Sequence, residues 1–403
     1  MSWSVSEVEH LRMEFVMIAL EEEVSISEAC RQFGISRKTG YKYLKRYKEE
    51  GLSGLSDRSR RPLSSKTIDG ETVMAIIKQR QKNGSWGPKK IRARLIRDGF
   101  TDPPGVATIG RILQRAGFSE AKGRGRPRRW NPAPIESQAL KPNDIWTVDF
   151  KGWWRAGDGQ RCEPLSVVDL FSRYILCLRP LKRRGVKDVR PVFEQLFARY
   201  GLPQTIRSDN GSPFAAITAP YGLTRLSAWW RSLGVALERI EPGHPEQNGA
   251  HERMHGNIAR EIEARPAATW EQEARRLEQW RIQYNLERPH EALKMKVPGD
   301  LYRRSTRRLE HTSPCSYPWG NLLRRVKKDG CICLQGRIVY LSEALSRQTV
   351  GLEQTGRSKY EVSFCDLQLG EIDLEHGPTL RPPASASDHA PQKKCNLCPD
   401  NKV

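Results

Sequence analysis

The sequence has no long apolar run. No stretch approaches the roughly 18 consecutive apolar residues of a membrane-spanning helix. Met1 to Ser4 also lack the basic segment and following apolar segment of a signal peptide. The sequence therefore predicts an intracellular protein with no membrane partner.

Cysteine is sparse and irregularly spaced. The nine cysteines are an odd number, which favours reduced thiols over a disulfide framework, so we expect no structural disulfide. Cys395 and Cys398 have the spacing of half a zinc site, but one such pair supplies only two of the four ligands of a tetrahedral ion. Residues 378–403, rich in Pro, Ser, Ala and Lys, are predicted to form a disordered tail.

Acidic residues are in short supply. The chain has 47 Asp and Glu against 68 Lys and Arg, a formal net charge of +21. Residues 51–130 alone hold 19 Lys and Arg against six Asp and Glu, a net charge of +13. A field of this sign favours a polyanion such as nucleic acid, with an acidic membrane surface as the alternative.

Helical periodicity marks the N-terminal part of the chain. One amphipathic helix is predicted over Ser6–Glu22, and Ser27 is placed to cap a second helix that runs to Phe33. Gly34 supplies a turn, and Ser36 caps a longer helix over Arg37–Glu50. Two helices joined by a tight Gly turn indicate a helix-turn-helix.

In a helix-turn-helix the second helix enters the major groove of DNA. Four early residues of this helix are therefore predicted DNA contacts: Arg37, Lys38, Tyr41 and Lys42. The alternative is an ordinary three-helix bundle with a solvated basic face.

A second helical unit follows a basic linker at residues 53–66. Residues 67–118 contain three short apolar patterns of helical period, and Lys89 and Lys90 at the start of the middle helix are predicted DNA contacts. Residues 119–140 form a second basic linker that favours a DNA groove or backbone, with a solvated linker as the alternative. Its predicted contacts are Arg124, Arg126, Arg128 and Arg129.

The pattern changes to β after Asn143. We expect the order β-β-β-α-β-α-β-α-α as far as Asn285, which predicts an α/β domain with a mixed sheet. A segment rich in Val, Ile, Leu and Gly over residues 321–377 indicates a small β barrel or sandwich.

Two aspartates stand at unusual places in this α/β region. Asp149 interrupts the apolar strand Ile145–Phe150, where a charge is costly unless it is paired or binds a cation. Asp209 ends the next candidate strand and precedes the turn residue Gly211, a position suited to metal ligation. A mere turn is the alternative for Asp209.

A third carboxylate comes from the segment Pro242–Glu252. Glu252 is the preferred residue because a helix holds a ligand at fixed geometry, whereas Glu246 lies in a Pro/Gly loop and stays the alternative. Asn248, one turn before Glu252 on the same face, is a predicted DNA contact. Three oxygen donors suit a pair of Mg²⁺ ions, with Mn²⁺ as a substitute, and such a pair performs phosphodiester chemistry.

The motifs in this region resemble those of a known family. Trp-Thr-Val-Asp-Phe at 146–150, Ser-Asp-Asn-Gly-Ser-Pro-Phe at 208–214, Glu-Arg-Met-His at 252–255 and Arg-Pro-His-Glu-Ala-Leu at 288–293 closely resemble the integrase-like DDE transposases of bacterial insertion sequences. The resemblance spans roughly residues 27–293. It implies an RNase H-like core with Asp149, Asp209 and Glu252 as catalytic metal ligands.

The resemblance also implies cutting at element ends and strand transfer into target DNA by a multimer. The expected partners are double-stranded DNA and further copies of the chain, with no small-molecule substrate, and the expected location is cytoplasmic and nucleoid-associated. Separated by 42 residues, Asp209 and Glu252 are further apart than in retroviral relatives, and Phe214–Leu226 accounts for the insertion. Asp169 is a fourth candidate and is interpreted as structural, paired with Arg173, with a direct metal role as the alternative.

The expected organisation is multidomain α+β. The predicted parts are a helix-turn-helix domain at 1–52, a basic linker at 53–66, a second helix-turn-helix-like domain at 67–118, a basic linker at 119–140, the RNase H-like core at 141–296, a connector at 297–320, an SH3-like β barrel at 321–377 and the tail at 378–403.

Two other functions fit parts of the sequence. A catalytically silent DNA-binding regulator derived from a transposase would keep the same motifs. His251-Glu252-Arg253-Met254-His255 also matches H-E-x-x-H, the zinc site of a metalloprotease, although no third ligand follows and a protease explains neither the charge nor the helix-turn-helix.

Overall fold

The computed structural model describes residues 5–21, 23–58, 68–118, 137–216, 219–240, 249–311, 315–377 and 379–381. The chain divides into two compact units, residues 1–69 and 70–403. Within the described residues, no helix combines the length and the apolar character needed to cross a membrane. The predicted contacts Arg124, Arg126, Arg128, Arg129 and Asn248, the alternative ligand Glu246, and the Cys395/Cys398 pair all lie outside the described residues.

The first unit is a helical bundle. Its helices are α1 (Val5–Leu20), α2 (Ile26–Gln32) and α3 (Arg37–Glu50), followed by the 3-10 helix η1 (Gly51–Leu55). Ser36 caps α3 as predicted, its hydroxyl accepting from the backbone N–H of Thr39 at 3.2 Å. The cap of α2 is Ser25 rather than the predicted Ser27, because Ser25 has extended backbone and accepts from the N–H of Glu28.

Close packing in this bundle depends on Gly40. A Cβ atom there would lie 2.5 Å from Sγ of Cys30 and 2.9 Å from Cζ of Phe15. The missing side chain therefore lets α3 approach α1 and α2 closely over the buried core of Phe15, Val16 and Leu44.

The second unit begins with three more helices, α4 (Gly70–Lys82), α5 (Pro88–Arg97) and α6 (Val106–Arg115). Their apolar faces meet in one small core that contains Ile76, Trp86, Ile91 and Ile109. Pro88 at the first turn of α5 fits the rule that proline is tolerated where the N–H has no helical partner.

A five-stranded mixed sheet forms the centre of the second unit, in the order β5-β4-β1-β6-β7. Within it β4 pairs antiparallel with both β1 and β5, β6 adds in parallel to β1, and β7 adds in parallel to β6. The sheet strands are β1 (Ile145–Phe150), β4 (Pro164–Asp169), β5 (Ile175–Pro180), β6 (Thr205–Ser208) and β7 (Ala236–Arg239); β2 (Trp154–Arg155) and β3 (Arg161–Cys162) form a separate hairpin.

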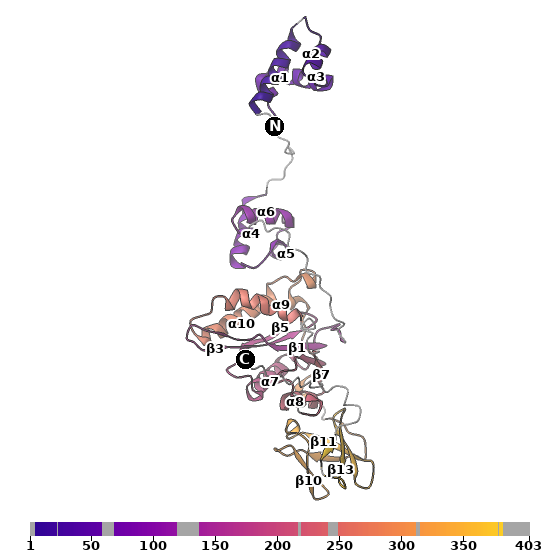
Figure 1. The fold of residues 1–403 in the computed structure, drawn as a ribbon. Helices are drawn as coiled ribbons and strands as arrows, with labels where there is room; N and C mark the ends of the chain where they lie inside the picture. The colour runs from indigo at the N-terminus through magenta and orange to yellow at the C-terminus, as the bar shows by residue number, and fades with distance from the viewer. Residues whose placement is uncertain are drawn as a thin grey trace, which may run out of the picture. The chain divides into compact units, whose positions relative to one another are not determined.

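Helices cover both faces of this sheet, as Figure 1 shows for α7 and α8 on one face and α9 and α10 on the other. The α7 and α8 side buries Trp146, Phe193 and Trp230, and the α9 and α10 side buries Ile175 and Leu277. The helices are α7 (Val186–Tyr200), α8 (Arg225–Ser232), α9 (Gly249–Ile258), continued by the π-helix η4 (Ala259–Glu263), and α10 (Trp270–Leu286). The mixed α/β core predicted from the sequence is confirmed.

The C-terminal segment is built of strands on a core of its own. One sheet has the order β14-β13-β12-β11-β8, and β9 pairs with β10 in a second. No hydrogen-bonded pair among the described strands closes the larger sheet, so a closed barrel stays a prediction. The strands are β8 (Leu322–Arg325), β9 (Cys331–Leu334), β10 (Arg337–Tyr340), β11 (Thr349–Gln354), β12 (Lys359–Phe364), β13 (Leu367–Asp373) and β14 (Leu380–Arg381).

The remaining short helices are η2 (Pro220–Gly222), η5 (Glu291–Leu293), α11 (Pro298–Leu301), η6 (Leu309–His311) and η7 (Glu343–Leu345). The C-terminal strands pack on the central domain through α8, whose Ala228 is fully buried in their core. Arg231 of α8 forms an ion pair with Asp366 between β12 and β13.

The expectation that the chain has no disulfide is wrong. Cys315 and Cys365 are bonded, with their Cα atoms 4.9 Å apart. They are separated by 50 residues, and only the folding of the C-terminal strands brings the segment before β8 beside the turn after β12. The spacing rule failed because it carries no information about such a tertiary contact.

Candidate active site

The sheet places Asp149 and Asp209 side by side. Strands β1 and β6 are parallel, and the last pair of their register joins Val148 to Ser208. Asp149 follows Val148 within β1 and Asp209 directly follows the end of β6, so both carboxylates come from the same edge of the sheet. Carboxyl ends of neighbouring parallel strands are the usual place for ligand-binding groups in open α/β sheets.

Helix α9 brings the third carboxylate to this edge. Met254 and Ile258 of α9 are buried against the sheet, while Glu252 in the first turn is exposed. Glu252 acts electrostatically on Asp149, which places these two carboxylates in one local field. The structure therefore brings Asp149 and Asp209 together and places Glu252 on a helix that packs against the same sheet.

The surroundings of Asp149 disfavour the charged form of its carboxyl group. Burial first, and then the negative charge of Asp209, raises the pKa of its carboxyl group to about 7, with Glu252 adding to the effect. The backbone N–H of Phe150 and the guanidinium of Arg184 act in the opposite direction. A carboxylate in such a setting gains from a bound cation, which would neutralise the mutual repulsion.

The donor set fits a hard divalent cation. All three side chains supply oxygen, the donor that Mg²⁺ and Mn²⁺ prefer. Among the described residues, no three His, Cys, Asp or Glu side chains converge closely enough to form a metal centre as they stand. Glu252 is exposed on the first turn of its helix.

Ser166 and His255 join the elements that carry the carboxylates. Nε2 of His255, on α9, lies 2.9 Å from the hydroxyl of Ser166 on β4, and that hydroxyl donates to the backbone carbonyl of Asp149 at 3.0 Å. Nδ1 of His255 is 3.8 Å from Oδ2 of Asp149. Burial, then the charge of Lys151, lowers the pKa of His255 to about 4, so the ring is neutral at pH 7. These contacts fix α9 against β1.

The two histidines of the H-E-x-x-H motif face the protein interior. His251 is 1% exposed, and burial, followed by the neighbouring His255, lowers its pKa well below the ordinary value. Its ring centroid is 5.3 Å from that of His255, whose Nε2 contacts Ser166. A catalytic zinc site needs ligands that face an open coordination position. This geometry therefore does not favour the metalloprotease.

Asp169 is fully buried at the end of β4, and its hydrogen bonds lie within the fold. Its carboxylate accepts from the backbone N–H of Asn143 at 2.7 Å and of Ser172 at 2.8 Å. Burial raises its pKa, while these bonds oppose the rise. Arg173, the partner expected from the sequence, donates its backbone N–H to the main-chain carbonyl of Asp169 at 2.9 Å.

The predicted DNA contacts of the first unit share one face. Arg37, Lys38, Tyr41 and Lys42 are all exposed at the N-terminal half of α3, and Tyr41 is 57% exposed. The Nζ atom of Lys42 lies 4.6 Å from the ring centroid of Tyr43. An exposed face of three cations and one aromatic residue is a suitable surface for a DNA groove.

Lys89 and Lys90 instead face the central domain. Lys89 forms an ion pair with Glu291 at 3.1 Å. Burial, and then the charge of Arg288, lowers the pKa of Lys90 to about 8. Both lysines therefore take part in an intramolecular contact, whereas α6 leaves Arg111 and Arg115 exposed.

That contact is centred on Glu261 of the π-helix. Its carboxylate accepts from Arg288 at 2.9 Å and from the indole N–H of Trp280 at 2.6 Å, and it also bonds Ser85 in the turn between α4 and α5. A cavity of about 640 Å³ lies between this turn and α10, and Glu261 is one of its lining residues.

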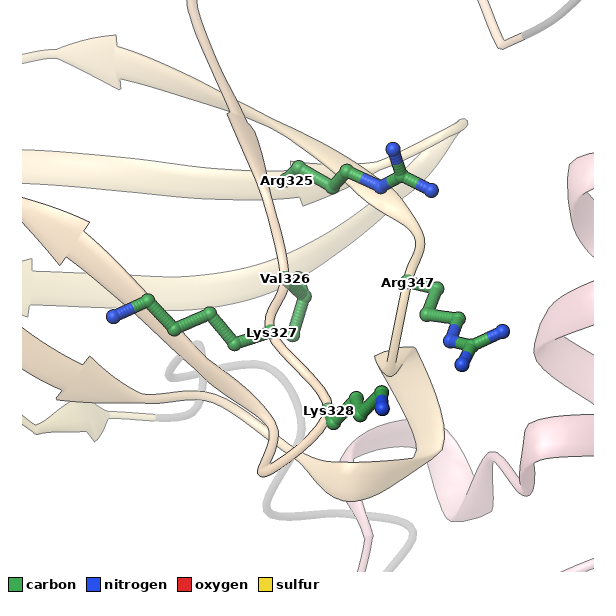
Figure 2. A pocket seen from close by; sticks show the side chains of 5 residues that line it. All are labelled: Arg325, Val326, Lys327, Lys328 and Arg347. Atoms are coloured by element: carbon green, nitrogen blue, oxygen red, sulfur yellow. The ribbon is translucent and has the colours of Figure 1, made fainter.

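A basic pocket lies in the C-terminal segment. It measures about 410 Å³ and is lined by Arg325, Val326, Lys327, Lys328 and Arg347. Figure 2 shows Arg325 and Arg347 extending to the same side of this segment and Lys327 to the other. Arg325, Lys327 and Lys328 belong to the basic run at 324–328, and the fold adds Arg347 from a separate part of this stretch.

Family models match most of the described domains. Models described as "Integrase core domain" match residues 139–245 and 233–298. A "Helix-turn-helix domain" model matches residues 11–62, and a "Homeodomain-like domain" model matches residues 39–113. The chain is therefore a helix-turn-helix protein with an integrase core.

Curated relatives come from mobile elements. The chain is 27% identical over 292 residues to the "Insertion element IS407 uncharacterized 31.7 kDa protein" of Burkholderia multivorans, which covers 71% of this chain and 94% of the relative. It is 30% identical over 179 residues to the "Insertion element IS476 uncharacterized 39.2 kDa protein" of Xanthomonas euvesicatoria, covering 43% and 49%. The integrase core matches and these insertion-element relatives together support an insertion-sequence transposase of the integrase superfamily.

Solved integrases are also similar to the chain. The HTLV-2 integrase catalytic core domain in complex with magnesium is 16% identical, with a TM-score of 0.31, and covers 41% of this chain and 100% of that chain. The simian T-cell lymphotropic virus intasome in complex with a PP2A regulatory subunit is 16% identical, with a TM-score of 0.36, and covers 72% of this chain and 97% of that chain.

Sequence reasoning missed Ser166, His255 and Arg184 as parts of this site. His255 had a usable signal, since it lies one helical turn after Glu252 and therefore on the same face of α9. Ser166 and Arg184 had none, because each reaches the site only through the tertiary fold.

Proposed function

We propose that the chain is a DDE transposase that cuts the ends of its element and joins the 3′-hydroxyls to target DNA. The observation that carries the proposal is the juxtaposition of Asp149 and Asp209 at one sheet edge, with Glu252 in the same electrostatic field. The matches to integrase core and helix-turn-helix models are consistent with a site that cuts and joins phosphodiester bonds of DNA.

The three carboxylates would hold two Mg²⁺ ions, or Mn²⁺ in their place. Bound ions of this kind activate a water or 3′-hydroxyl nucleophile and stabilise the leaving oxygen. The chain's own residues hold the geometry, because β1 and β6 fix the aspartates and the His255–Ser166 contact fixes the helix of Glu252. No covalent enzyme intermediate is required.

DNA recognition is assigned to the N-terminal parts of the chain. The exposed face of α3 would read a groove, and the second helical unit would add a further contact. Lys89, which is exposed but paired with Glu291, and Lys90 remain proposed DNA contacts, and the exposed Arg111 and Arg115 of α6 are further candidates. The same proposal includes assembly of several copies of the chain on DNA and an SH3-like barrel formed by the C-terminal strands.

A strand-transfer assay tests the proposal. Labelled duplex from the inverted repeats that flank the gene is incubated with the full chain in Mg²⁺, Mn²⁺ or EDTA, with Asp209→Asn as the control. We expect joined products that need both the metal and Asp209. Bound but unjoined DNA in every metal would instead favour the catalytically silent regulator.

Substitutions distinguish the transposase from a metalloprotease. Asp149→Asn would abolish DNA transfer and leave a protease intact, whereas His255→Ala would abolish proteolysis. The burial of His251 already speaks against a protease.

A further inference from the structure

Arg184 lies at the rim of the carboxylate site. It belongs to the loop between β5 and α7, directly before Gly185, the cap of α7. Its guanidinium carbon is 5.1 Å from the ring centroid of Phe150, the residue after Asp149. Arg184 also interacts electrostatically with Asp149 and Asp209. A cation from a different part of the chain therefore stands beside the two strand aspartates.

Glu163 fixes the position of Arg184. The Nε atom of Arg184 donates to Oε1 of Glu163 at 2.6 Å, and its Nη2 atom donates to the same oxygen. Glu163 is 4% exposed. Burial alone would raise the pKa of Glu163, but the hydrogen bonds and charges of Arg184 and Arg161 lower it, so it stays an anion. A buried anion on a strand connection is a rigid anchor for a long side chain.

Two arginines share this one anchor. Arg161 donates to Oε2 of Glu163 at 3.1 Å, and its guanidinium carbon lies 4.8 Å from the ring centroid of Trp153. One carboxylate neutralises one of the two charges, so the pair leaves an excess of one positive charge. The side chain of Arg184 is 45% exposed although it is anchored, so part of its guanidinium faces solvent beside the site.

We propose that Arg184 binds a non-bridging oxygen of the DNA strand that is cut, at the scissile phosphate or the phosphate next to it. Glu163 is the positioning residue that holds the guanidinium in place. A guanidinium presents several N–H donors in a planar fork that matches phosphate geometry, and this one has a fixed orientation beside the reacting carboxylates. This inference rests on the proposed function, because it assumes that phosphodiester DNA enters the carboxylate site.

Arg161 provides a matched control. Both arginines pair with Glu163 and both are about half exposed, but only Arg184 lies over Phe150 and interacts with Asp149 and Asp209. A loss caused by weakening the Glu163 anchor would follow from either substitution. A loss caused by a missing phosphate contact would follow from Arg184 alone.

The first experiment measures binding, independently of cutting. A fluorescent duplex carrying the terminal repeat is titrated with Arg184→Gln and Arg161→Gln, each in the Asp209→Asn background, in Mg²⁺ at several salt concentrations. Loss of one phosphate contact lowers the slope of log affinity against log salt by about 0.9. We expect this change for Arg184→Gln and an unchanged slope for Arg161→Gln.

The second experiment locates the contact. Single methylphosphonates, which remove the charge of one phosphate, are placed at each position near the cut site. At one position the substitution should weaken binding of the Asp209→Asn protein and have no further effect when Arg184→Gln is added. Additive effects at every position would overturn the proposal.

The third experiment measures cleavage with otherwise native protein. Arg184→Gln should slow single-turnover cleavage at saturating DNA roughly 10- to 150-fold, the loss expected for one charged hydrogen bond. Arg184→Lys should recover part of the rate, and Glu163→Gln should fall between the wild type and Arg184→Gln. Equal losses for Arg184→Gln and Arg161→Gln would overturn the proposal.

The same variants distinguish a phosphate contact from simple charge screening by Arg184, and from failure of the proposed function. If Arg184 only screens the carboxylates, Arg184→Gln will bind Mn²⁺ more tightly, as measured by electron paramagnetic resonance, with an unchanged salt slope, and the proposal is then wrong. If the wild type binds DNA but never cuts it, the proposed function fails, while the salt slope and the methylphosphonate test still decide whether Arg184 contacts phosphate.

Discussion

Replacing Asp149 by Asn should stabilise the metal-free protein at neutral and alkaline pH. The carboxyl group has a pKa of about 7 in the folded chain, against an ordinary value of 3.8. The folded state therefore binds more protons than the unfolded chain between about pH 4 and pH 7. The free energy of unfolding then falls as the pH rises through this range and stays low above it.

The magnitude follows from the size of this shift. Three pKa units at 1.36 kcal/mol per unit give an upper bound of about 4 kcal/mol above pH 7. The side chain of Asp149 is 26% exposed, so solvent screening reduces this value, and we expect a gain of about 1–4 kcal/mol for Asp149→Asn at pH 8. At pH 4 the native carboxyl is already protonated and the gain should vanish.

Thermal unfolding in EDTA measures the effect. Trp146 and Trp230 are fully buried in the core beside this sheet, so tryptophan fluorescence reports its melting. The gain corresponds to roughly 2–4 °C in Tm per kcal/mol for a domain of this size. Mg²⁺ should raise the Tm of the wild type at pH 8 and have less effect on the variant.

Glu194→Gln is the control, because it removes an exposed carboxylate on α7 and should change stability by less than about 0.5 kcal/mol. The reasoning is refuted if Asp149→Asn melts at or below the wild-type temperature at pH 8. An equal gain at pH 4 and pH 8 would also refute it, since packing and not charge would then be the cause.

Three further substitutions test other contacts. His255→Ala should slow strand transfer roughly 10- to 100-fold and leave DNA affinity unchanged, because it releases α9 from Ser166. If the effects of His255→Ala and Ser166→Ala are additive in the double mutant, the two residues do not act together and this reasoning is wrong. Glu261→Ala should destabilise the second unit by about 3–5 kcal/mol because it leaves the nearly buried Arg288 without its carboxylate, and a denaturation midpoint equal to that of the wild type would exclude this role. Ala228→Asp should expose the sites before β8 to limited proteolysis, because it buries a charge in the core shared by α8 and the C-terminal strands; unchanged cleavage would show that this contact is not needed.

The sequence by itself determined the local elements and selected the three carboxylates of the proposed site. Helix α3 was predictable because its cap at Ser36 and its apolar spacing act within a few residues of one another. Asp149 stood out because a charge inside an apolar strand has few explanations. The neighbouring positions of Asp149 and Asp209 follow only once β1 and β6 pair in parallel and in this register, since both residues directly follow the last pair, Val148 and Ser208.

Only the tertiary structure decided which distant residues meet. The Cys315–Cys365 bond, the Arg184–Glu163 pair and the contact of Lys89 with Glu291 join residues separated by 50, 21 and 202 positions. Periodicity and capping reflect interactions over about one or two helical turns, so they carry no information about such pairs. Strand order, register and domain packing set these distances, and for this reason the sequence did not predict that Lys89 pairs with Glu291 of the central domain.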